Sequence, residues 1–316
     1  MRDFKERLYE EWMESQVIDL FISEYGGEKE KFKKHFKSLY ESNYQKNLCI
    51  RVVSVDGEKI VGFQSYFYWP LKDKLKTIKS YQSGNSLVHP EYRGCGIFKS
   101  LLNFINLELK RMNPDVLIGF PVEASFNSFV RNGWSNPFNL RWYLKVVNPF
   151  AIILDNLGQS QELKFPVRDN ADVVSGLFRP YSTEFDNWRS NFQQEKIYEF
   201  RFQDKGLAIS FAMKFAKRKS IFGELIIGEV DVNTDDVSFI KRGLKALIKE
   251  SRKNSKVLFI SCALNPNYSC GFNNIIKKSF INSKREIYFI TKLLSEDITE
   301  PELQQLNLYR GDIDTW

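Results

Sequence analysis

The chain has 316 residues, a formal charge of +7 at pH 7 and a hydrophobic content of 43%. This length is enough for one large or two ordinary domains with cores of their own. Acidic and basic residues are interspersed without a long block of lysine or arginine, which favours a solvated basic surface over a nucleic-acid-binding one. We therefore expect no nucleic acid partner, whereas anionic small ligands are compatible with the charge.

Cysteine usage and the N-terminal sequence narrow the class further. The four cysteines and two histidines form no CxxC pair and no zinc-ligand spacing, so we expect no metal site. A chain of this size does not need disulfides, and the stretch 1–15 is charged and amphipathic, unlike a signal peptide. No apolar run approaches the roughly 20 residues of a membrane span. We expect a cytoplasmic protein that does not bind membranes.

Hydrophobic periodicity predicts two helices followed by a sheet in the first half. The helices are expected at 3–24 and 28–43, separated by Gly26-Gly27. Three strands follow, and Asp56-Gly57 is a hairpin signal between the first two. A long helix, a short buried strand, a short helix and a final strand complete this half. The expected ranges are 48–55, 60–69, 77–88, 97–111, 116–120, 125–131 and 140–147.

The second half repeats this order after a short strand at 162–167 and a helical or loop region at 171–195. Its expected strands and helices lie at 197–203, 206–215, 221–232, 235–250, 257–262, 272–280 and 285–294. Ser125-Phe126-Asn127 also resembles Gly271-Phe272-Asn273, and each triplet follows an apolar strand. We predict an α/β fold of the α+β type with two copies of one domain, at 1–150 and 151–316. Each copy would be a mixed, mostly antiparallel sheet flanked by helices. A chance similarity between two αβ halves is the alternative.

The stretch from Ser83 to Leu102 carries the strongest chemical signal. It reads as a strand end, a turn at 93–97 with two glycines, and the first turns of a helix. The glycines allow successive N–H groups to face one point, and the helix N-terminus adds its positive dipole end. This arrangement is typical of a site for an anion such as a pyrophosphate. The second half has three aspartates before its long helix instead, so we expect only the first half to hold the anion.

One family signature fits this turn. The pattern V-x-P-x-x-R-G-x-G-[IVL] is matched by Val88-His89-Pro90-Glu91-Tyr92-Arg93-Gly94-Cys95-Gly96-Ile97. Together with Gly133-Trp134, this makes residues 45–147 resemble the GNAT superfamily of acyl-CoA-dependent N-acyltransferases. The resemblance implies an acyl-CoA co-substrate, with its pyrophosphate on the amides of the turn and its pantetheine along the strand end. The residues implied to contact CoA are Leu87, Val88, Arg93, Gly94, Cys95, Gly96, Ile97, Phe98 and Ser125.

The sequence departs from the family pattern at three positions. Phe98 stands where the glycine motif usually ends in a small residue. Val122 stands where an asparagine often contacts pantetheine, so Ser125 is the expected substitute. Phe129 stands where a tyrosine often protonates the leaving thiolate, which argues against a tyrosine general acid at that position.

More narrowly, the whole chain resembles the two-copy GNAT proteins of bacterial polysaccharide clusters, which acylate amino sugars on a nucleotide carrier. This resemblance implies transfer of an acetyl or 3-hydroxybutanoyl group to a dTDP-linked amino deoxysugar, and we expect a monomer or homodimer. The implied acceptor contacts are Trp188, Arg189, Tyr198, Asp312 and Asp314. Core packing is the alternative for the aromatic residues, and a solvated tail is the alternative for the aspartates.

Transfer of an acyl group from a thioester to an amine requires a neutral amine but no strong base. Asn85 is our first candidate for orienting the amine or the acyl carbonyl, with Ser83 on the same face of the strand. Glu123 is the candidate base or amine anchor. A hydrogen bond to a bulge for Asn85, and a solvated helix N-terminal charge for Glu123, are the alternatives. At the level of function, the alternatives are a GNAT enzyme for another small amine or peptide and a non-catalytic CoA-binding regulatory module.

Overall fold

The computed structural model describes residues 4–72, 77–149, 165–166, 183–192, 196–218, 222–254 and 256–313. The helices and strands of the first half follow the order expected for a sheet with helices on both faces. They are β1 (Phe4–Leu8), α1 (Glu14–Tyr25), α2 (Lys29–Tyr40), β2 (Ile50–Asp56), β3 (Lys59–Tyr68), β4 (Leu71–Lys72), β5 (Thr77–Ile78), β6 (Ser80–Val88), α3 (Ile97–Lys110), β7 (Val116–Gly119), α4 (Glu123–Arg131) and β8 (Ser135–Val146).

The second half repeats the order of strands and helices from β2 to β8. Its elements are α6 (Thr183–Phe192), β9 (Ile197–Asp204), β10 (Leu207–Arg218), β11 (Phe222–Val232), α7 (Val237–Arg252), β12 (Phe259–Leu264), α8 (Gly271–Ser279), β13 (Ile281–Leu293), α9 (Glu300–Gln304) and a 3₁₀ turn at Arg310–Asp312. The predicted strand at 162–167 lies almost wholly outside the described residues.

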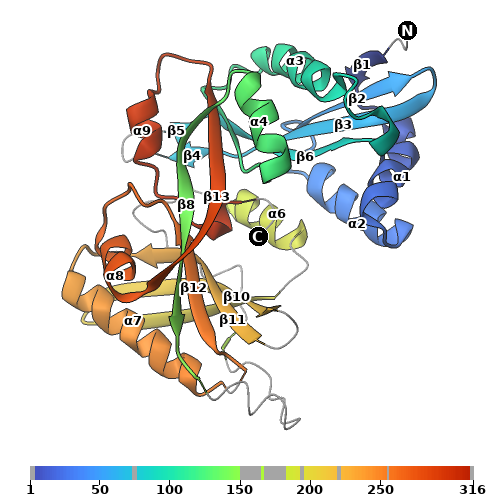
Figure 1. The fold of residues 1–316 in the computed structure, drawn as a ribbon. Helices are drawn as coiled ribbons and strands as arrows, with labels where there is room; N and C mark the ends of the chain where they lie inside the picture. Colours follow the sequence, from blue (N-terminus) through green and yellow to red (C-terminus); the bar gives the residue numbers. More distant parts are fainter. Residues whose placement is uncertain are drawn as a thin grey trace.

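Both halves contribute to one sheet of eleven strands, in the order β1-β2-β3-β6-β7-β13-β8-β12-β11-β10-β9. The last strand of each half is placed against the other half: β13 lies between β7 and β8, and β8 lies between β13 and β12. These two long strands run side by side through the middle of the molecule (Figure 1). The only parallel pairings of the described strands are β6 with β7 and β11 with β12. The predicted mixed, mostly antiparallel sheet is therefore confirmed.

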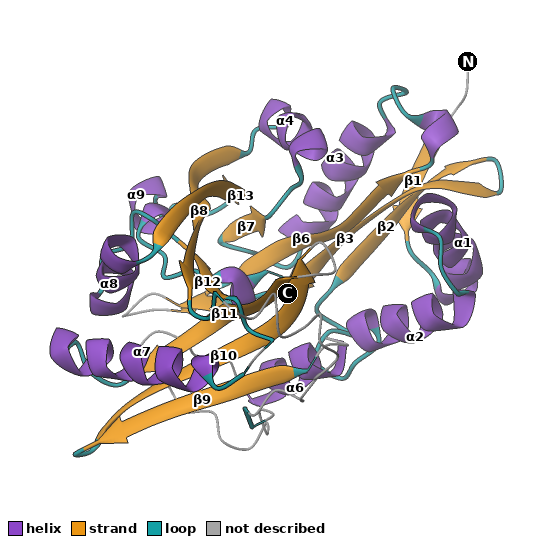
Figure 2. Ribbon diagram, turned by 60° about the horizontal axis from the view of Figure 1, so that its bottom comes forward, coloured by secondary structure: helices purple, strands orange, loops and turns teal. Residues whose placement is uncertain are grey.

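Helices cover both faces of this sheet (Figure 2). One face packs against α3 in the first half and against α7 and α8 in the second. On α3, Ile97, Leu101, Ile105 and Leu109 form the predicted apolar stripe, and all four are buried. The other face packs against α1, α2 and α6 and carries one core that continues from the first half into the second. No helix in the described part of the chain combines the length and the hydrophobicity needed to cross a membrane.

The prediction of a single helix at 3–24 is wrong at its start. Residues Phe4–Leu8 form an edge strand that pairs antiparallel with β2, and the helix begins only at Glu14. Phe4 and Glu6 are half-buried while Lys5 and Arg7 are exposed, which is the alternation of a strand. The sequence does not show this alternation, because the half-buried Glu6 is charged. Ladder hydrogen bonds to β2 therefore override the local sequence pattern.

Candidate active site

The glycine turn between β6 and α3 has the geometry of an anion site. Gly94 and Gly96 have φ angles of +79° and +83°, values that favour glycine because side chains crowd the backbone there. A Cβ atom built on either glycine meets no heavy atom within 4 Å, so the space above the turn is open. Gly96 is the N-cap of α3, and the first-turn N–H groups of that helix have no intrahelical partner. These groups fit a pyrophosphate.

The predicted flanking arginine is held by two groups of the protein. Arg93 forms an ion pair with Glu24 of α1 at 2.7 Å, and its Nε donates to the backbone carbonyl of Val88 at 3.3 Å. About half of the Arg93 side chain is exposed. Cys95 is exposed too. Arg93 thus links the turn to α1 and to the end of β6, while the amides of the turn remain open to a ligand.

Beside this turn, β6 and β7 separate. They pair in parallel only from Ser80 with Val116 to Ser83 with Gly119. Beyond that point β7 has ended, whereas β6 continues to Val88. A register shift between β3 and β6, at Gly84 and Asn85, accompanies the separation. The open edge of β6 therefore runs from the contact point of the two strands toward the glycine turn.

The register shows which backbone groups face this open edge. His89 donates its N–H to the carbonyl of Val61 at 2.9 Å, so the backbone N–H and C=O groups of His89 point toward β3. Those of Leu87, two residues earlier, point the same way. Ser86 and Val88 then direct their backbone groups to the opposite side, along the open edge. The side chain of Leu87 is buried in the core. Of the two strand residues predicted to meet pantetheine, Val88 directs its N–H along the open edge, while its carbonyl accepts from Arg93 Nε and the Leu87 side chain packs in the core beneath the strand.

The structure places Ser83 and Asn85 on opposite faces of the sheet. Ser83 Oγ accepts a hydrogen bond from Gln64 Nε2 at 3.1 Å. Asn85 Nδ2 donates to the hydroxyl of Tyr40 at 3.0 Å, and that hydroxyl also bonds Ser65 Oγ at 2.8 Å. Burial raises the pKa of Tyr40, so its hydroxyl stays protonated. The β-bulge explains why the two predicted residues do not share a face, because it shifts the alternation by one residue.

Helix α4 places the phenyl ring of Phe129, rather than a tyrosine hydroxyl, beside the glycine turn and its helix. Phe129 is buried, and its ring packs edge-on against Phe98 at 5.3 Å and against Trp134 at 5.1 Å. The two phenylalanines that depart from the family pattern therefore contact each other. Ser125 is half-buried near the start of the helix and donates its hydroxyl to the carbonyl of Val122 at 3.2 Å.

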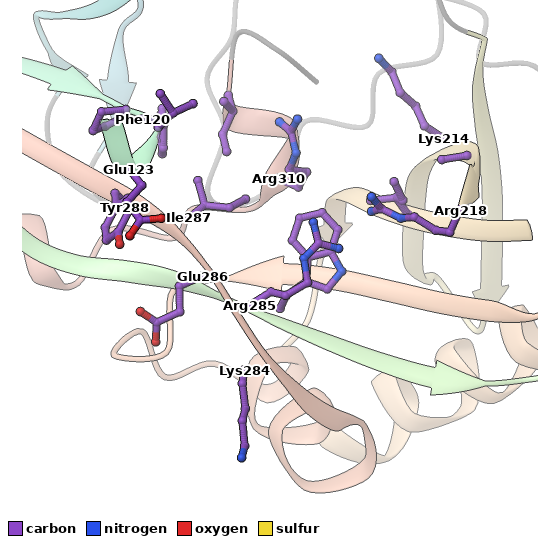
Figure 3. Close-up of a pocket in the computed structure, with 16 residues that line it drawn as sticks. Phe120, Glu123, Lys214, Arg218, Lys284, Arg285, Glu286, Ile287, Tyr288 and Arg310 are labelled. Atoms are coloured by element: carbon purple, nitrogen blue, oxygen red, sulfur yellow. The ribbon is translucent and has the colours of Figure 1, made fainter. Parts of the chain in front are cut away.

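A cavity of about 790 Å³ lies where β7 ends. It is lined by residues from both halves (Figure 3). Most of its apolar lining residues belong to the core on the face of the sheet opposite α3. Its described lining residues are Phe120, Pro121, Val122, Glu123, Trp142, Lys214, Ala216, Arg218, Ile226, Lys284, Arg285, Glu286, Ile287, Tyr288, Arg310 and Ile313.

The lining carries five cationic and two anionic side chains. Arg285 lies 5.0 Å from the ring centre of Trp142, and Arg218 lies 5.8 Å from the same ring. Arg218 is paired with the buried Glu224. Among the described residues, Arg285 has no carboxylate partner, and its side chain is exposed. A guanidinium held over an indole and open to solvent is suited to binding a phosphate or carboxylate.

Glu123 and Tyr288 occupy the other end of the cavity (Figure 3). Tyr288 stacks on Phe126 at 4.4 Å, and Phe126 lies on the same face of α4 as Glu123, three residues away. Tyr288 supplies the only hydroxyl among the described lining residues. Of the three predicted catalytic residues, Glu123 is the one that lines this cavity.

The structure places four of the five predicted acceptor contacts outside the cavity lining: Trp188, Arg189, Tyr198 and Asp312. Trp188 is 2% exposed, stacks on Tyr44 and donates its Nε1–H to the carbonyl of Leu39 at 2.9 Å. Arg189 is buried and pairs with Glu229 at 2.7 Å. Trp188 thus takes the core-packing role that the sequence left open, since its ring is enclosed by other side chains. Tyr198, on β9, packs on the face of α7 and α8, opposite the cavity.

Asp312 is buried and accepts a hydrogen bond from the Tyr309 N–H at 2.7 Å, within the 3₁₀ turn. It therefore supports the turn from which Arg310 and Ile313 reach the cavity. The remaining predicted contact, Asp314, lies outside the described residues.

The corresponding slot of the second half is filled by the protein itself. Strands β11 and β12 pair only from Glu224 to Ile227, after which they separate while β11 remains paired with β10 up to Val232. The 3₁₀ turn packs there: a Cβ on Gly311 would lie 2.4 Å from the carbonyl oxygen of Gly228. At the start of α7, Asp236 accepts the N–H of Ser238 at 2.7 Å. A carboxylate of the chain thus occupies the helix N-terminus that would correspond to the anion site.

Sequence reasoning missed the cationic residues of the cavity and Tyr288. They lie on β10, on β13 and in the 3₁₀ turn of the second half, and they meet Glu123 only because β13 is inserted beside β7. The one available signal was Lys284-Arg285 directly before an aromatic strand. Among the described residues, no group of three or more histidine, cysteine, aspartate or glutamate side chains could hold a metal ion.

Comparison with solved structures places this arrangement among known folds. The chain is similar to a GCN5-related N-acetyltransferase from Anabaena variabilis, with a TM-score of 0.63, 12% sequence identity, and coverage of 93% of this chain and 73% of that one. A GCN5-related N-acetyltransferase from Kribbella flavida matches with a TM-score of 0.58, 12% identity, and coverage of 92% and 71%. The chain has the GNAT fold.

A third match has the same fold over the whole chain. Saccharomyces cerevisiae N-myristoyltransferase, solved with bound myristoyl-CoA, matches with a TM-score of 0.54, 11% identity, and coverage of 100% of this chain and 85% of that chain. Each of the three structures covers more than nine tenths of this chain, so the joined halves are part of the shared GNAT fold. At these identities the likeness is one of fold. No family model matches the sequence, and no curated protein sequence matches it.

Proposed function

We propose that this chain is an acyl-CoA-dependent N-acyltransferase whose first half binds acyl-CoA and whose second half completes the acceptor site. The observation that carries this proposal is the continuity of three features: an anion-binding turn, an open strand edge and a cavity at the end of β7. The turn suits the pyrophosphate of CoA, the open strand edge suits its pantetheine arm, and the cavity suits the acceptor. The turn and the slot have no open counterpart in the described part of the second half, which supports a single acyl-CoA site.

The proposed acceptor is the amine of a nucleotide-linked amino deoxysugar, such as a dTDP-linked one. Support comes from Arg285 over Trp142, which suits a diphosphate beside a base or sugar ring. The amine would approach the open strand edge past Glu123 and Tyr288. In this proposal, Arg285 binds the diphosphate at one end of the cavity, and the amine loses its proton beside Glu123 at the other end.

In the proposed reaction, the amine nitrogen attacks the thioester carbonyl carbon, a C–N bond forms and the C–S bond breaks. A sugar amine with a pKa of about 8 is roughly one-tenth neutral at pH 7, which costs about 1.4 kcal/mol. Glu123, directly or through water, takes the proton that the nitrogen loses. That proton then passes from Glu123, through water, to the CoA thiolate, so that an amide and CoA thiol are released and Glu123 is again a carboxylate.

The function is tested by following free thiol release from acetyl-CoA and 3-hydroxybutanoyl-CoA in the presence of a panel of dTDP- and UDP-amino sugars. We expect thiol release with at least one sugar. Release only with simple amines or peptides would replace the proposed acceptor. CoA binding without release across all acceptors would indicate a regulatory CoA-binding module.

An Arg285→Glu variant is expected to raise the acceptor KM by about 10- to 100-fold, the range for losing one hydrogen bond to a charged group. The acyl-CoA KM should change less than about twofold, because Arg285 lies on the acceptor side. Arg201→Glu, an exposed arginine on the outer strand β9, is the matched control. An unchanged acceptor KM in Arg285→Glu would exclude this end of the cavity as the anion site.

A Glu123→Gln variant is expected to lower kcat by about 10²- to 10⁴-fold at pH 7, the usual contribution of a positioned base. The amide keeps the size of the side chain but cannot accept the amine proton. Part of this activity should return at higher pH, where more of the amine is already neutral. A kcat within twofold of the wild-type value at pH 7 would show that Glu123 is only a solvated charge at the start of α4.

A further inference from the structure

The 3₁₀ turn at Arg310–Asp312 occupies a defined point of the second half. Strands β11 and β12 last pair at Ile227 and Cys262, and the next residue of β11, Gly228, is the extra residue of a bulge against β10. In the first half, β6 and β7 also last pair directly before a bulge, at Ser83. The turn therefore packs at the inner end of the second slot. The thioester of acyl-CoA would lie at the corresponding point of the first slot.

Gly311 is the residue that fits this point. It is buried, and a Cβ built on it would meet the carbonyl oxygen of Gly228 and, at 2.8 Å, the Cγ of Glu229. The backbone of a paired strand cannot move aside as the end of a flexible side chain can. Gly311 does not have a positive φ angle, so close contact rather than backbone strain selects glycine here. Any side chain at this position would push the turn away from β11.

Hydrogen bonds fix the turn from several sides. Arg189 of α6 donates to the carbonyl of Gly311 at 2.6 Å. Asp312 accepts the N–H of Tyr309 at 2.7 Å, and the Tyr309 hydroxyl donates to Asn273 of α8 at 2.9 Å. The turn is thus held against α6 and α8 as well as β11, so its position is determined by the slot that it fills.

The residue before Gly311 reaches the acceptor cavity. Arg310 is half-buried and lines this cavity. In Figure 3 it lies between the end that carries Glu123 and the end that carries Arg218. An acceptor with its amine beside Glu123 and its diphosphate at Arg285 would therefore present its middle to Arg310. A guanidinium at this place suits the phosphate nearest the sugar.

We propose that Arg310 binds the sugar-proximal phosphate of the acceptor and that Gly311 is the positioning residue that sets Arg310 in place. The slot of the second half then serves as a socket for the chain's own turn. A side chain at position 311 would lift the turn from this socket and move Arg310 away from the acceptor, while the acyl-CoA site of the first half stays intact. This inference rests on the proposed function and names two further residues of its acceptor site.

The test measures dTDP and CoA binding to the full-length protein by calorimetry, with dTDP as the probe for the nucleotide diphosphate. Arg310→Met and Gly311→Ala should each weaken dTDP binding at least about tenfold, the effect of losing a hydrogen bond to a charged group. CoA affinity should stay within about twofold. The double variant should bind dTDP about as weakly as either single variant, because both changes remove the same contact. In the thiol-release assay, both variants should raise the acceptor KM and leave the acyl-CoA KM within about twofold.

Gly223→Ala is the matched control. A Cβ on Gly223, near the start of β11, would meet the carbonyl oxygen of Lys256, and Gly223 does not line the cavity. Gly223→Ala should lower the unfolding temperature, as Gly311→Ala should, but keep the wild-type dTDP affinity. Equal losses of dTDP affinity in the two glycine variants would overturn the positioning role.

Arg310→Met keeps the inference testable even where Gly311→Ala does not fold. Wild-type dTDP affinity in Arg310→Met would overturn the inference and leave the proposed function standing. A wild-type protein that binds CoA but not dTDP would instead overturn the proposed acceptor, and the role of Arg310 would fall with it.

Discussion

A Gly96→Asp variant is expected to bind CoA at least about 100-fold more weakly than the wild-type protein. The new carboxylate would stand at the N-cap of α3, where the proposed pyrophosphate receives the first-turn N–H groups. Two like charges about 4 Å apart near a protein surface repel by roughly 4 kcal/mol, and each 1.4 kcal/mol is a tenfold change in affinity. Calorimetric titration with CoA measures this loss directly.

Backbone strain requires a control of its own, because Gly96 has a φ angle of +83°. Gly206, in the turn between β9 and β10, has a φ angle of +81°, and a Cβ there also meets no atom within 4 Å. Gly206→Asp therefore imposes a similar strain without a charge at the helix N-terminus. We expect it to bind CoA as the wild-type protein does. A Gly96→Asp protein that folds and retains CoA affinity would place the pyrophosphate elsewhere.

The glycine turn could be predicted from the sequence because its determinants are local. Gly94 and Gly96 specify positive φ angles, and the apolar stripe that follows at Ile97 and Leu101 specifies a helix on the sheet. Both signals lie within a few residues of each other. The strand Val116–Gly119 and helix α4 were predicted for the same reason.

The cavity could not be predicted because it depends on pairing between distant strands. Ile290 lies opposite Gly119 across the ladder of β13 and β7, which brings Arg285 and Tyr288 past the end of β7. Nothing in the local sequence near Arg285 specifies that β13 pairs with the first half. The hydrophobic pattern of a strand specifies which face is buried, but it does not specify which partner strand it joins.

Trp188 and Arg189 illustrate a different limit of sequence reasoning. An aromatic residue beside an arginine suits a nucleotide pocket, but it equally suits a buried pair in a core. The structure places the indole among Tyr44, Phe67 and Trp69, and the guanidinium against Glu229. Composition alone cannot distinguish these roles, because both use the same stacking and hydrogen-bonding chemistry.

An Arg189→Met variant is expected to lower the free energy of unfolding by about 3–5 kcal/mol, the usual cost of removing one partner of a buried ion pair. Arg189 and Glu229 are 4% and 5% exposed, with 2.7 Å between Nη2 and Oε1. Arg189 also donates to the carbonyl of Gly311 at 2.6 Å, so it connects α6 to the turn that carries Arg310 and Ile313 into the cavity. Urea denaturation followed by circular dichroism measures the loss.

The pair Arg242 and Asp204 provides the matched comparison, because its Nη2 to Oδ2 distance is 2.8 Å while its side chains are 55% and 35% exposed. Arg242→Met should cost less than about 1 kcal/mol, since water screens an exposed pair and solvates the carboxylate left behind. Combining Arg189→Met with Glu229→Leu should recover much of the stability lost in Arg189→Met, because neither charge of this pair is then buried. Equal losses in Arg189→Met and Arg242→Met would mean that Glu229 is hydrated in the folded protein and that the buried ion pair adds little to the free energy of unfolding.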